Sequence, residues 1–253
     1  MPKAIAQSEP YLKNPGMKII LLFAVAIISA LVGVGATYWL TMGDREQLAS
    51  FQKQEVYYQQ QELFNKAWDR INSYIGNPSH SGGLRDAIEL LAGERKPLHR
   101  LYLYNAQLQG LTLPPKANLN GVQLVRADLQ DSVMPEVGMS GAWLSAAHLV
   151  GSCLKGADLS GAVVGAATLN EVSWGAANLE GADLRGANLD GKNEYWAGVE
   201  LRGADLRGAK GLSCEKLQRA LNWQEAFRVE ALSCDAEIPR REEPPRCDEL
   251  GVD

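Results

Sequence analysis

A bulky apolar residue recurs at every fifth position along the middle of the chain, without a slip from Leu119 to Leu189. Two positions before each of these residues stands a smaller one, most often Ala. The bulky series is Leu119, Leu124, Leu129, Met134, Met139, Leu144, Leu149, Leu154, Leu159, Val164, Leu169, Trp174, Leu179, Leu184 and Leu189. No helical period produces this repeat. Because residues two apart on an extended backbone point to the same side, we expect both members of each pair to face inward.

The residue between the two inward positions should face water, and it is often Asn or Asp, as at Asn118. Many units end in Gly, as at Gly121, which allows a sharp turn where a Cβ would clash. Each five-residue unit is therefore predicted to be one short side followed by a corner. The register extends back to Leu103 with one inserted residue, and forward to Leu206 after an interruption at residues 192–198.

The runs GADLSGA, AANLEGADLRGANLDG and VELRGADLRGAKGL resemble the pentapeptide-repeat family. The resemblance covers residues 101–212 and implies a mainly β fold, a right-handed quadrilateral β-helix with four units per coil. About twenty units then make about five coils, spaced by about 4.8 Å. Trp174 departs from the pattern, because this inward position usually holds Leu or Phe. Positions twenty apart should stack, so we expect Trp174 beside Tyr195 and Trp196, where the insertion makes room for the indole.

The N-terminal part of the chain has a different pattern. From Ile19 to Gly43 there is no charged residue, and this run is long enough to cross a bilayer core of about 30 Å as a helix. We predict a transmembrane helix over residues 19–43, with a cleaved signal peptide as the main alternative. Three lysines against one glutamate precede it, so residues 1–18 are expected in the cytoplasm. The chain should be a single-pass protein of a bacterial inner membrane, with its repeats on the periplasmic side.

A helical stalk and an N-terminal cap are predicted over residues 44–100. Residues 45–75 lack Pro and Gly, and their apolar residues are spaced mostly by three, four and seven. These apolar residues are Leu48, Phe51, Tyr58, Leu63, Ala67, Ile71 and Ile75. A second, short helix is expected at about residues 84–91, where it can cover the unpaired edge of the first coil. A homodimer through the stalk or cap helices stays open.

The last part of the chain, residues 213–253, is predicted to hold a capping helix and a flexible tail. Ser213 is a suitable N-cap for a helix that runs to about Phe227. The residues expected to cover the last coil are Leu217, Leu221 and Trp223. The tail from Asp235 combines three prolines with mixed charges and has no apolar period.

The four cysteines form no CxxC pair, which argues against zinc or thioredoxin-type motifs. They are Cys153, Cys214, Cys234 and Cys247. Cys214 and Cys234 lie twenty positions apart across the predicted cap, so an oxidising compartment would allow a disulfide between them. Cys234 with Cys247 is the competing pair.

No catalytic, cofactor-binding or metal-binding residues are expected. His148, one of three histidines, occupies an outward position between Asp128 and Thr168 of the adjacent coils, and an exposed His beside a carboxylate is usually structural. No phosphate-binding loop is present. Residues 101–212 hold 8 Lys and Arg against 11 Asp and Glu without a basic stripe, so direct nucleic-acid binding is not expected.

One apolar spot is predicted on the outside of the coils. Trp143 faces outward and Val163 should lie directly beside it, which suits an anchor for a protein partner. Alternatively, the cap or the N-terminal helix folds over Trp143. We therefore expect a non-enzymatic, membrane-tethered scaffold for protein–protein interaction. The resemblance implies an alternative function, because some members of the family mimic duplex DNA and protect DNA gyrase, a topoisomerase.

Overall fold

The computed structural model describes residues 42–76, 82–227 and 234 of the 253-residue chain. Its helices are α2 (Met42–Gly76), α3 (Leu84–Gly93), η2 (Asn193–Trp196), α4 (Cys214–Arg219) and η3 (Trp223–Glu225). The chain divides into two compact units after Gln61, within α2.

The predicted transmembrane helix lies outside the described residues, except for the two residues with which α2 begins. The tail from residue 235 onward lies outside them as well. Of the helices that the structure describes, none combines the length and the apolar character needed to span a bilayer.

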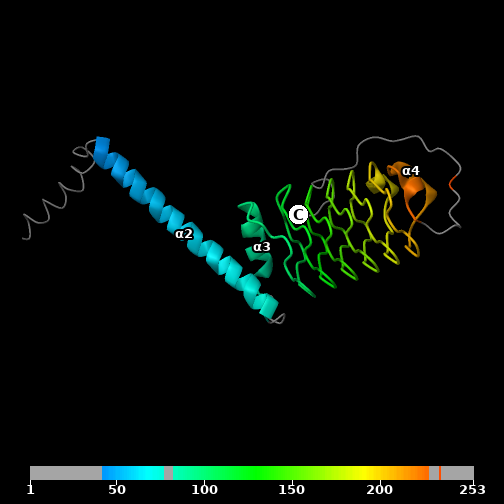
Figure 1. The fold of residues 1–253 in the computed structure, drawn as a ribbon, viewed down its shortest axis with the longest axis horizontal. Helices are drawn as coiled ribbons and strands as arrows, with labels where there is room; N and C mark the ends of the chain where they lie inside the picture. The colour runs from blue at the N-terminus through cyan, green and yellow to red at the C-terminus, as the bar shows by residue number, and fades with distance from the viewer. Residues whose placement is uncertain (1–41, 77–81, 228–233, 235–253) are drawn as a thin grey trace, which may run out of the picture. The chain divides into compact units, whose positions relative to one another are not determined.

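Between α3 and α4 the chain winds into a regular coil (Figure 1). Each five-residue unit contributes one parallel bridge and then a turn. From Asn118 to Asn188 the bridges join residues twenty positions apart, so a coil consists of four units and has four sides. Each side forms a single bridge, and the described residues contain no longer strand. The prediction of a four-sided β-helix is thus confirmed, with bridges in place of the strands that a mainly β fold suggests.

The two inward positions of the units are buried, as predicted. One inward column consists of Leu129, Leu149, Leu169 and Leu189, each at most 1% exposed. Backbone bonds tie the coils of this column together, since the N–H of Leu149 donates to Thr168 O at 2.8 Å and the N–H of Leu169 donates to Asn188 O at 2.8 Å. Each buried leucine contributes about 1.5–3 kcal/mol. Side-chain stacking and the hydrogen-bond ladder therefore impose the same twenty-residue repeat.

The corners require a left-handed backbone, but they do not require glycine. At one corner Gly151 has a φ of 70°, and the same corner holds Asp131 and Glu171 one coil before and one coil after, with φ values of 55° and 56°. A residue with a Cβ adopts this conformation at some cost. Glycine is therefore frequent at the corners without being invariant.

Extra residues shift the register at two places, as the sequence predicts. Tyr102 pairs with Gln123, twenty-one positions away, because one residue is inserted within residues 112–118. The second shift occurs at η2, which lies between the two partners of the next bridge: Asn178 pairs with Glu200, twenty-two positions further along the chain. Regular pairing continues after both insertions.

Trp174 points inward and is 1% exposed. In the next coil, η2 replaces the regular side, and Tyr195 and Trp196 are buried as well. The ladder resumes immediately, because the N–H of Ala176 donates to Ala197 O at 2.9 Å. The inward position of Trp174 and the break in the coil beside it agree with the sequence-based prediction.

The second half of α2 and helix α3 close the N-terminal end of the β-helix. Their buried residues are Phe64, Ala67, Ile71, Tyr74, Leu84, Ala87, Ile88, Leu91 and Ala92. The hydroxyl of Tyr74 donates to Tyr104 O at 2.5 Å. The N–H of Thr112 donates to Oε1 of Glu89 at 2.8 Å. These helices thus satisfy backbone groups that the first coil would otherwise leave unpaired.

Toward the C-terminal end of α2, the predicted apolar face is right at Ala67 and Ile71 and wrong at Leu63 and Ile75. Leu63 and Ile75 are 53% and 40% exposed, whereas Phe64 and Tyr74 are buried. The buried positions 64, 67, 71 and 74 keep spacings of three, four and three residues, so the helical period is right and the buried face differs from the prediction only at its two outer positions. The α2 sequence by itself offers apolar residues at both sets of positions, and the packing of the second unit decides which of them are buried.

The predicted capping helix over residues 213–227 is also wrong in its extent. After α4 the chain rejoins the ladder, where Leu221 pairs with Glu200 and Phe227 pairs with Asp205. Leu221 is 38% exposed and therefore does not cover the last coil as expected. Trp223, also expected there, lies in η3 and is half-buried. Within the described residues, this end of the β-helix thus consists of the short helix α4 and a further partial coil that contains η3.

Lys216 fastens α4 to the β-helix. Its side chain is buried, and its Nζ donates to Leu189 O at 2.9 Å and to Gly211 O at 2.6 Å. Burial lowers the pKa of this ammonium group. The hydroxyl of Ser213 accepts from the N–H of Lys216, which is the predicted N-cap. Leu217 is fully buried beside it, and α4 packs against η2.

Candidate functional site: an exposed aromatic ladder

Seven residues form one continuous outward column, in which each pairs with the next through a parallel bridge. This column, the Trp143 ladder, consists of Tyr102, Gln123, Trp143, Val163, Asp183, Asp205 and Phe227. Its three aromatic residues are between 51% and 60% exposed. Tyr104 follows Tyr102 at the next corner, with 6.3 Å between the two ring centroids. The exposed aromatic side chains of the described part of the β-helix thus lie on one side of it.

Trp143 and Val163 lie side by side at the middle of this ladder. The N–H of Trp143 donates to Val122 O and that of Val163 to Ala142 O, both at 2.8 Å, so the backbone fixes their positions. Trp143 is 51% exposed and Val163 is half-buried. Within the described part of the second unit, neither cap covers the indole. The two residues make a flat apolar spot that a partner can reach.

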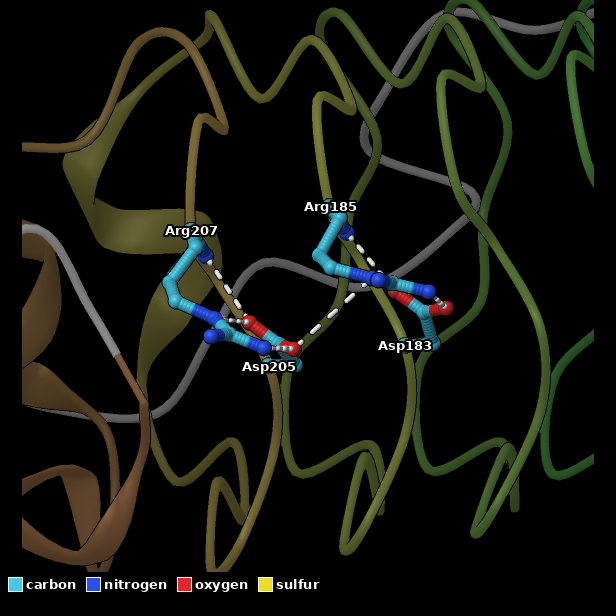
Figure 2. Close-up of polar contacts among 4 residues, drawn as sticks. All are labelled: Asp183, Arg185, Asp205 and Arg207. Atoms are coloured by element: carbon cyan, nitrogen blue, oxygen red, sulfur yellow. Dashed lines mark hydrogen bonds and ion pairs between the residues drawn. The ribbon is translucent and has the colours of Figure 1, made fainter.

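Two aspartate–arginine pairs occupy the C-terminal half of the same side (Figure 2). Nε and Nη2 of Arg185 donate to the two carboxylate oxygens of Asp183 at 2.8 and 2.7 Å. Arg207 binds Asp205 in the same two-pronged manner at 2.9 and 2.6 Å. Arg185 also lies 3.7 Å from the Asp205 carboxylate, which links the pairs of successive coils.

The pairing keeps both carboxylates ionised. The side-chain hydrogen bond from Arg185 lowers the pKa of Asp183. The corresponding bond from Arg207 lowers the pKa of Asp205. Each pair cancels its own charge while leaving further N–H groups of the half-exposed guanidinium groups toward solvent. This half of the side offers hydrogen-bonding groups without a net charge.

The repeats match a known family in sequence. Residues 116–149 and 157–193 match the profile described as "Pentapeptide repeats", in 8 copies. The chain is a pentapeptide-repeat protein.

Solved structures of other pentapeptide-repeat proteins share similarity with this chain. A protein from the thylakoid lumen of Arabidopsis thaliana is 29% identical over 36% of this chain and 59% of its own, with a TM-score of 0.30. Rfr23 from the cyanobacterium Cyanothece 51142 is 24% identical over 57% of this chain and 95% of its own, with a TM-score of 0.27. HetL from the cyanobacterium Nostoc is 21% identical over 52% of this chain and 86% of its own, with a TM-score of 0.22.

This pentapeptide-repeat protein thus spans about three fifths of the length of the Arabidopsis protein. No curated protein matches it in sequence. All three TM-scores lie below 0.5, so the activities of these proteins are not transferred to this one.

The predicted histidine ladder of the pentapeptide-repeat protein is also present. His148 is exposed and pairs with Asp128 and Thr168 of the adjacent coils. Nε2 of Gln109 donates to Oδ2 of Asp128, which engages this carboxylate from the preceding coil. No described group of three or more His, Cys, Asp or Glu side chains is arranged to hold a metal ion.

The structure joins Cys214 to Cys234 in a disulfide with a Cα–Cα distance of 5.2 Å. The bond attaches the isolated described residue, Cys234, to the first turn of α4. The competing pair of Cys234 with Cys247 is thereby excluded.

Sequence analysis missed Tyr102 and Phe227 as members of the aromatic side. Counting in steps of twenty from Trp143 leads to Val163 and Gln123, but it fails beyond the two insertions. Correcting each step for the inserted residues would have led to Tyr102. Phe227 lies at the end of the predicted capping helix, so no repeat count reaches it.

The aspartate–arginine pairs predict a dependence of stability on pH. A carboxyl with a lowered native pKa stabilises the fold above its unfolded pKa, and this contribution is lost as the pH falls through the native pKa. We expect the Asp183→Asn/Asp205→Asn variant to lose less stability than the parent between about pH 5 and pH 2. Thermal melts at a series of pH values measure this slope. Parallel slopes for both proteins would contradict the prediction.

Proposed function

We propose that this pentapeptide-repeat protein is a non-enzymatic, membrane-tethered scaffold that binds a protein partner through the Trp143 ladder. The main support is the gathering of exposed aromatic side chains on one side of the β-helix. Trp and Tyr are enriched among the residues that carry most of the energy of protein interfaces. An indole half-exposed on a flat side can bury its whole face against a partner.

The rigidity of the ladder favours binding by this side. Each side chain of the ladder is attached to a backbone that is hydrogen-bonded to its neighbours and spaced by about 4.8 Å. Such a surface loses little conformational entropy when it binds, which leaves more of the contact energy for affinity. A partner that complements this spacing needs no rearrangement of the scaffold.

The charge distribution favours a scaffold function. The alternative is a DNA-mimicking regulator of a topoisomerase such as gyrase. A DNA mimic needs rows of uncompensated negative charge. Here Asp183 and Asp205 are each neutralised by an arginine from the same unit (Figure 2).

The proposed membrane tether is the uncharged run of residues 19–43, and the β-helix would lie outside the cytoplasm. The disulfide between Cys214 and Cys234 supports this location, because disulfides persist mainly in oxidising compartments. The lysines before the run support the same orientation.

The stalk can contribute to assembly as well. Phe51 and Tyr58 lie seven positions apart on α2, and they are 66% and 59% exposed. Residues at this spacing share one helical face. A homodimer through this face is part of the proposal, and it would give a cross-linked product of twice the chain mass.

Topology is tested with fusions to the C-terminus of the full-length protein in a bacterial host. We expect an alkaline phosphatase fusion to be active and a fusion to a reporter that works only in the cytoplasm to be inactive. The reverse pattern would place the β-helix in the cytoplasm and would contradict the tether in the proposed orientation.

Partner binding is tested by photo-cross-linking in native membranes, with the reactive group introduced at Ser145, the corner that follows Trp143. We expect a distinct adduct with a second protein, and we expect Trp143→Ala to reduce its yield at least tenfold, because interface anchors contribute about 2 kcal/mol or more. The matched control is His148→Ala, an exposed side chain on the next side of the same coil. It should leave the adduct unchanged.

Equal yields from the parent and Trp143→Ala would contradict the proposed role of the ladder. Protection of DNA gyrase by the purified β-helix in a supercoiling assay would favour the alternative function instead.

A further inference from the structure

The contact points of the Trp143 ladder are evenly spaced along the β-helix. Tyr102 pairs with Gln123 and Gln123 pairs with Trp143, so the two aromatic residues lie two coils apart. Each coil advances by about 4.8 Å, which separates these two residues by about 9.6 Å along the axis. Two further coils lead from Trp143 to Asp183, the first of the aspartate–arginine pairs. A partner thus meets three contact points at one spacing.

The backbone of this side is not available for the addition of a β-strand. The N–H of Trp143 donates to Val122 O at 2.8 Å, and the Trp143 carbonyl accepts from the N–H of Leu124 at 2.7 Å. The N–H and the carbonyl of Val163 are bonded to the preceding coil in the same manner. A peptide that binds here therefore contacts side chains, and its own backbone must do without a strand partner.

A polyproline II helix matches the spacing of the contact points. It has three residues per turn and a rise of about 3.1 Å per residue, so it repeats every 9.3 Å or about two coils. Two turns of an α-helix, at about 5.4 Å each, exceed two coils by about 1 Å. An extended strand repeats about every 6.8 Å and does not match.

We infer that the Trp143 ladder binds a proline-rich segment of its protein partner in the polyproline II conformation. This inference rests on the proposed function, because it names the class of protein that the same surface binds.

The side chains of the ladder suit such a segment. Tyr102 and Trp143 are 53% and 51% exposed, so each can pack its ring against prolines, as aromatic residues do in known sites for proline-rich segments. Gln123 lies between them, and its side-chain amide has no hydrogen-bond partner among the described residues. This amide can bond the backbone of a polyproline II helix, which makes no internal hydrogen bonds. At the third contact point, Arg185 offers the N–H groups that Asp183 does not use (Figure 2).

The aromatic end of the ladder is positively charged, which favours acidic residues beside the prolines of the partner. Residues 95–127 contain five Arg and Lys and no Asp or Glu. Arg100 stands at the corner before Tyr102, and Arg126 stands at the corner after Gln123. Both arginine side chains are exposed, and neither forms an ion pair with a described residue, whereas Arg185 is neutralised by an aspartate. Complementary charges of the partner would fix its position on the ladder.

The test measures the binding of labelled peptides to the full-length protein in detergent by fluorescence anisotropy. The probe is a peptide of eight prolines with two glutamates at each end. One control peptide keeps the glutamates and replaces the prolines by Gly and Ser, which gives a flexible chain. A second control replaces them by Ala and Leu, which favour a helix. We expect the proline peptide to bind at least tenfold more tightly than either control, because its bound conformation is preformed.

Variants of the protein locate the binding site of the proline peptide. Trp143→Ala should weaken binding at least tenfold, and His148→Ala, on the next side of the same coil, should leave it unchanged. The double variant Arg100→Gln/Arg126→Gln should weaken binding about threefold or more at low salt. Its affinity should also depend less on the salt concentration than that of the parent.

Equal affinities for the proline peptide and either control peptide would overturn the inference. Unchanged binding of the proline peptide to Trp143→Ala would overturn it as well. The adduct in native membranes tests the proposed function separately. A Trp143-dependent adduct together with equal peptide affinities would reject the proline-rich partner and leave the scaffold function standing.

Discussion

Closure of the chain on itself every twenty residues is the constraint on which this structure depends. An inward leucine needs another inward leucine directly above it, and a ladder amide needs a carbonyl one coil further on. A shift of twenty residues along the chain provides both the leucine contact and the carbonyl. Packing and hydrogen bonding therefore select the same register. A slip by one residue would turn the inward side chains toward water.

The same constraint explains where the protein tolerates change. The single insertion within residues 112–118 and the two extra residues of η2 enlarge one side of a coil, and the ladder resumes directly afterwards. Outward positions are not bound by the packing of the interior. Trp143 and the Asp183–Arg185 pair can therefore occupy one side without disturbing the core (Figure 2). Function in such a fold is expected in outward columns, where side chains are free to vary.

The sequence predicts the coil well because its information is local and repeated many times. Burial of Leu149, stacking of Trp143 on Val163 and the inward position of Trp174 follow from counting in fives. The ends of the β-helix are harder to predict. Phe64 and Leu63 are apolar neighbours on α2, and the α2 sequence alone does not indicate which one is buried. The chain after α4 lacks the five-residue pattern. The sequence therefore contains no local signal that predicts the pairing of Leu221 with the ladder.

The central claim is that inward side chains carry the stability of the fold while outward ones are free for function. The most direct measurement compares the free energies of unfolding of Leu149→Ala and His148→Ala in urea, since these neighbours face opposite sides of one wall. We expect Leu149→Ala to cost about 2–5 kcal/mol. His148→Ala should stay within about 0.5 kcal/mol of the parent. Equal losses for the two variants, or a larger loss for His148→Ala, would contradict the account.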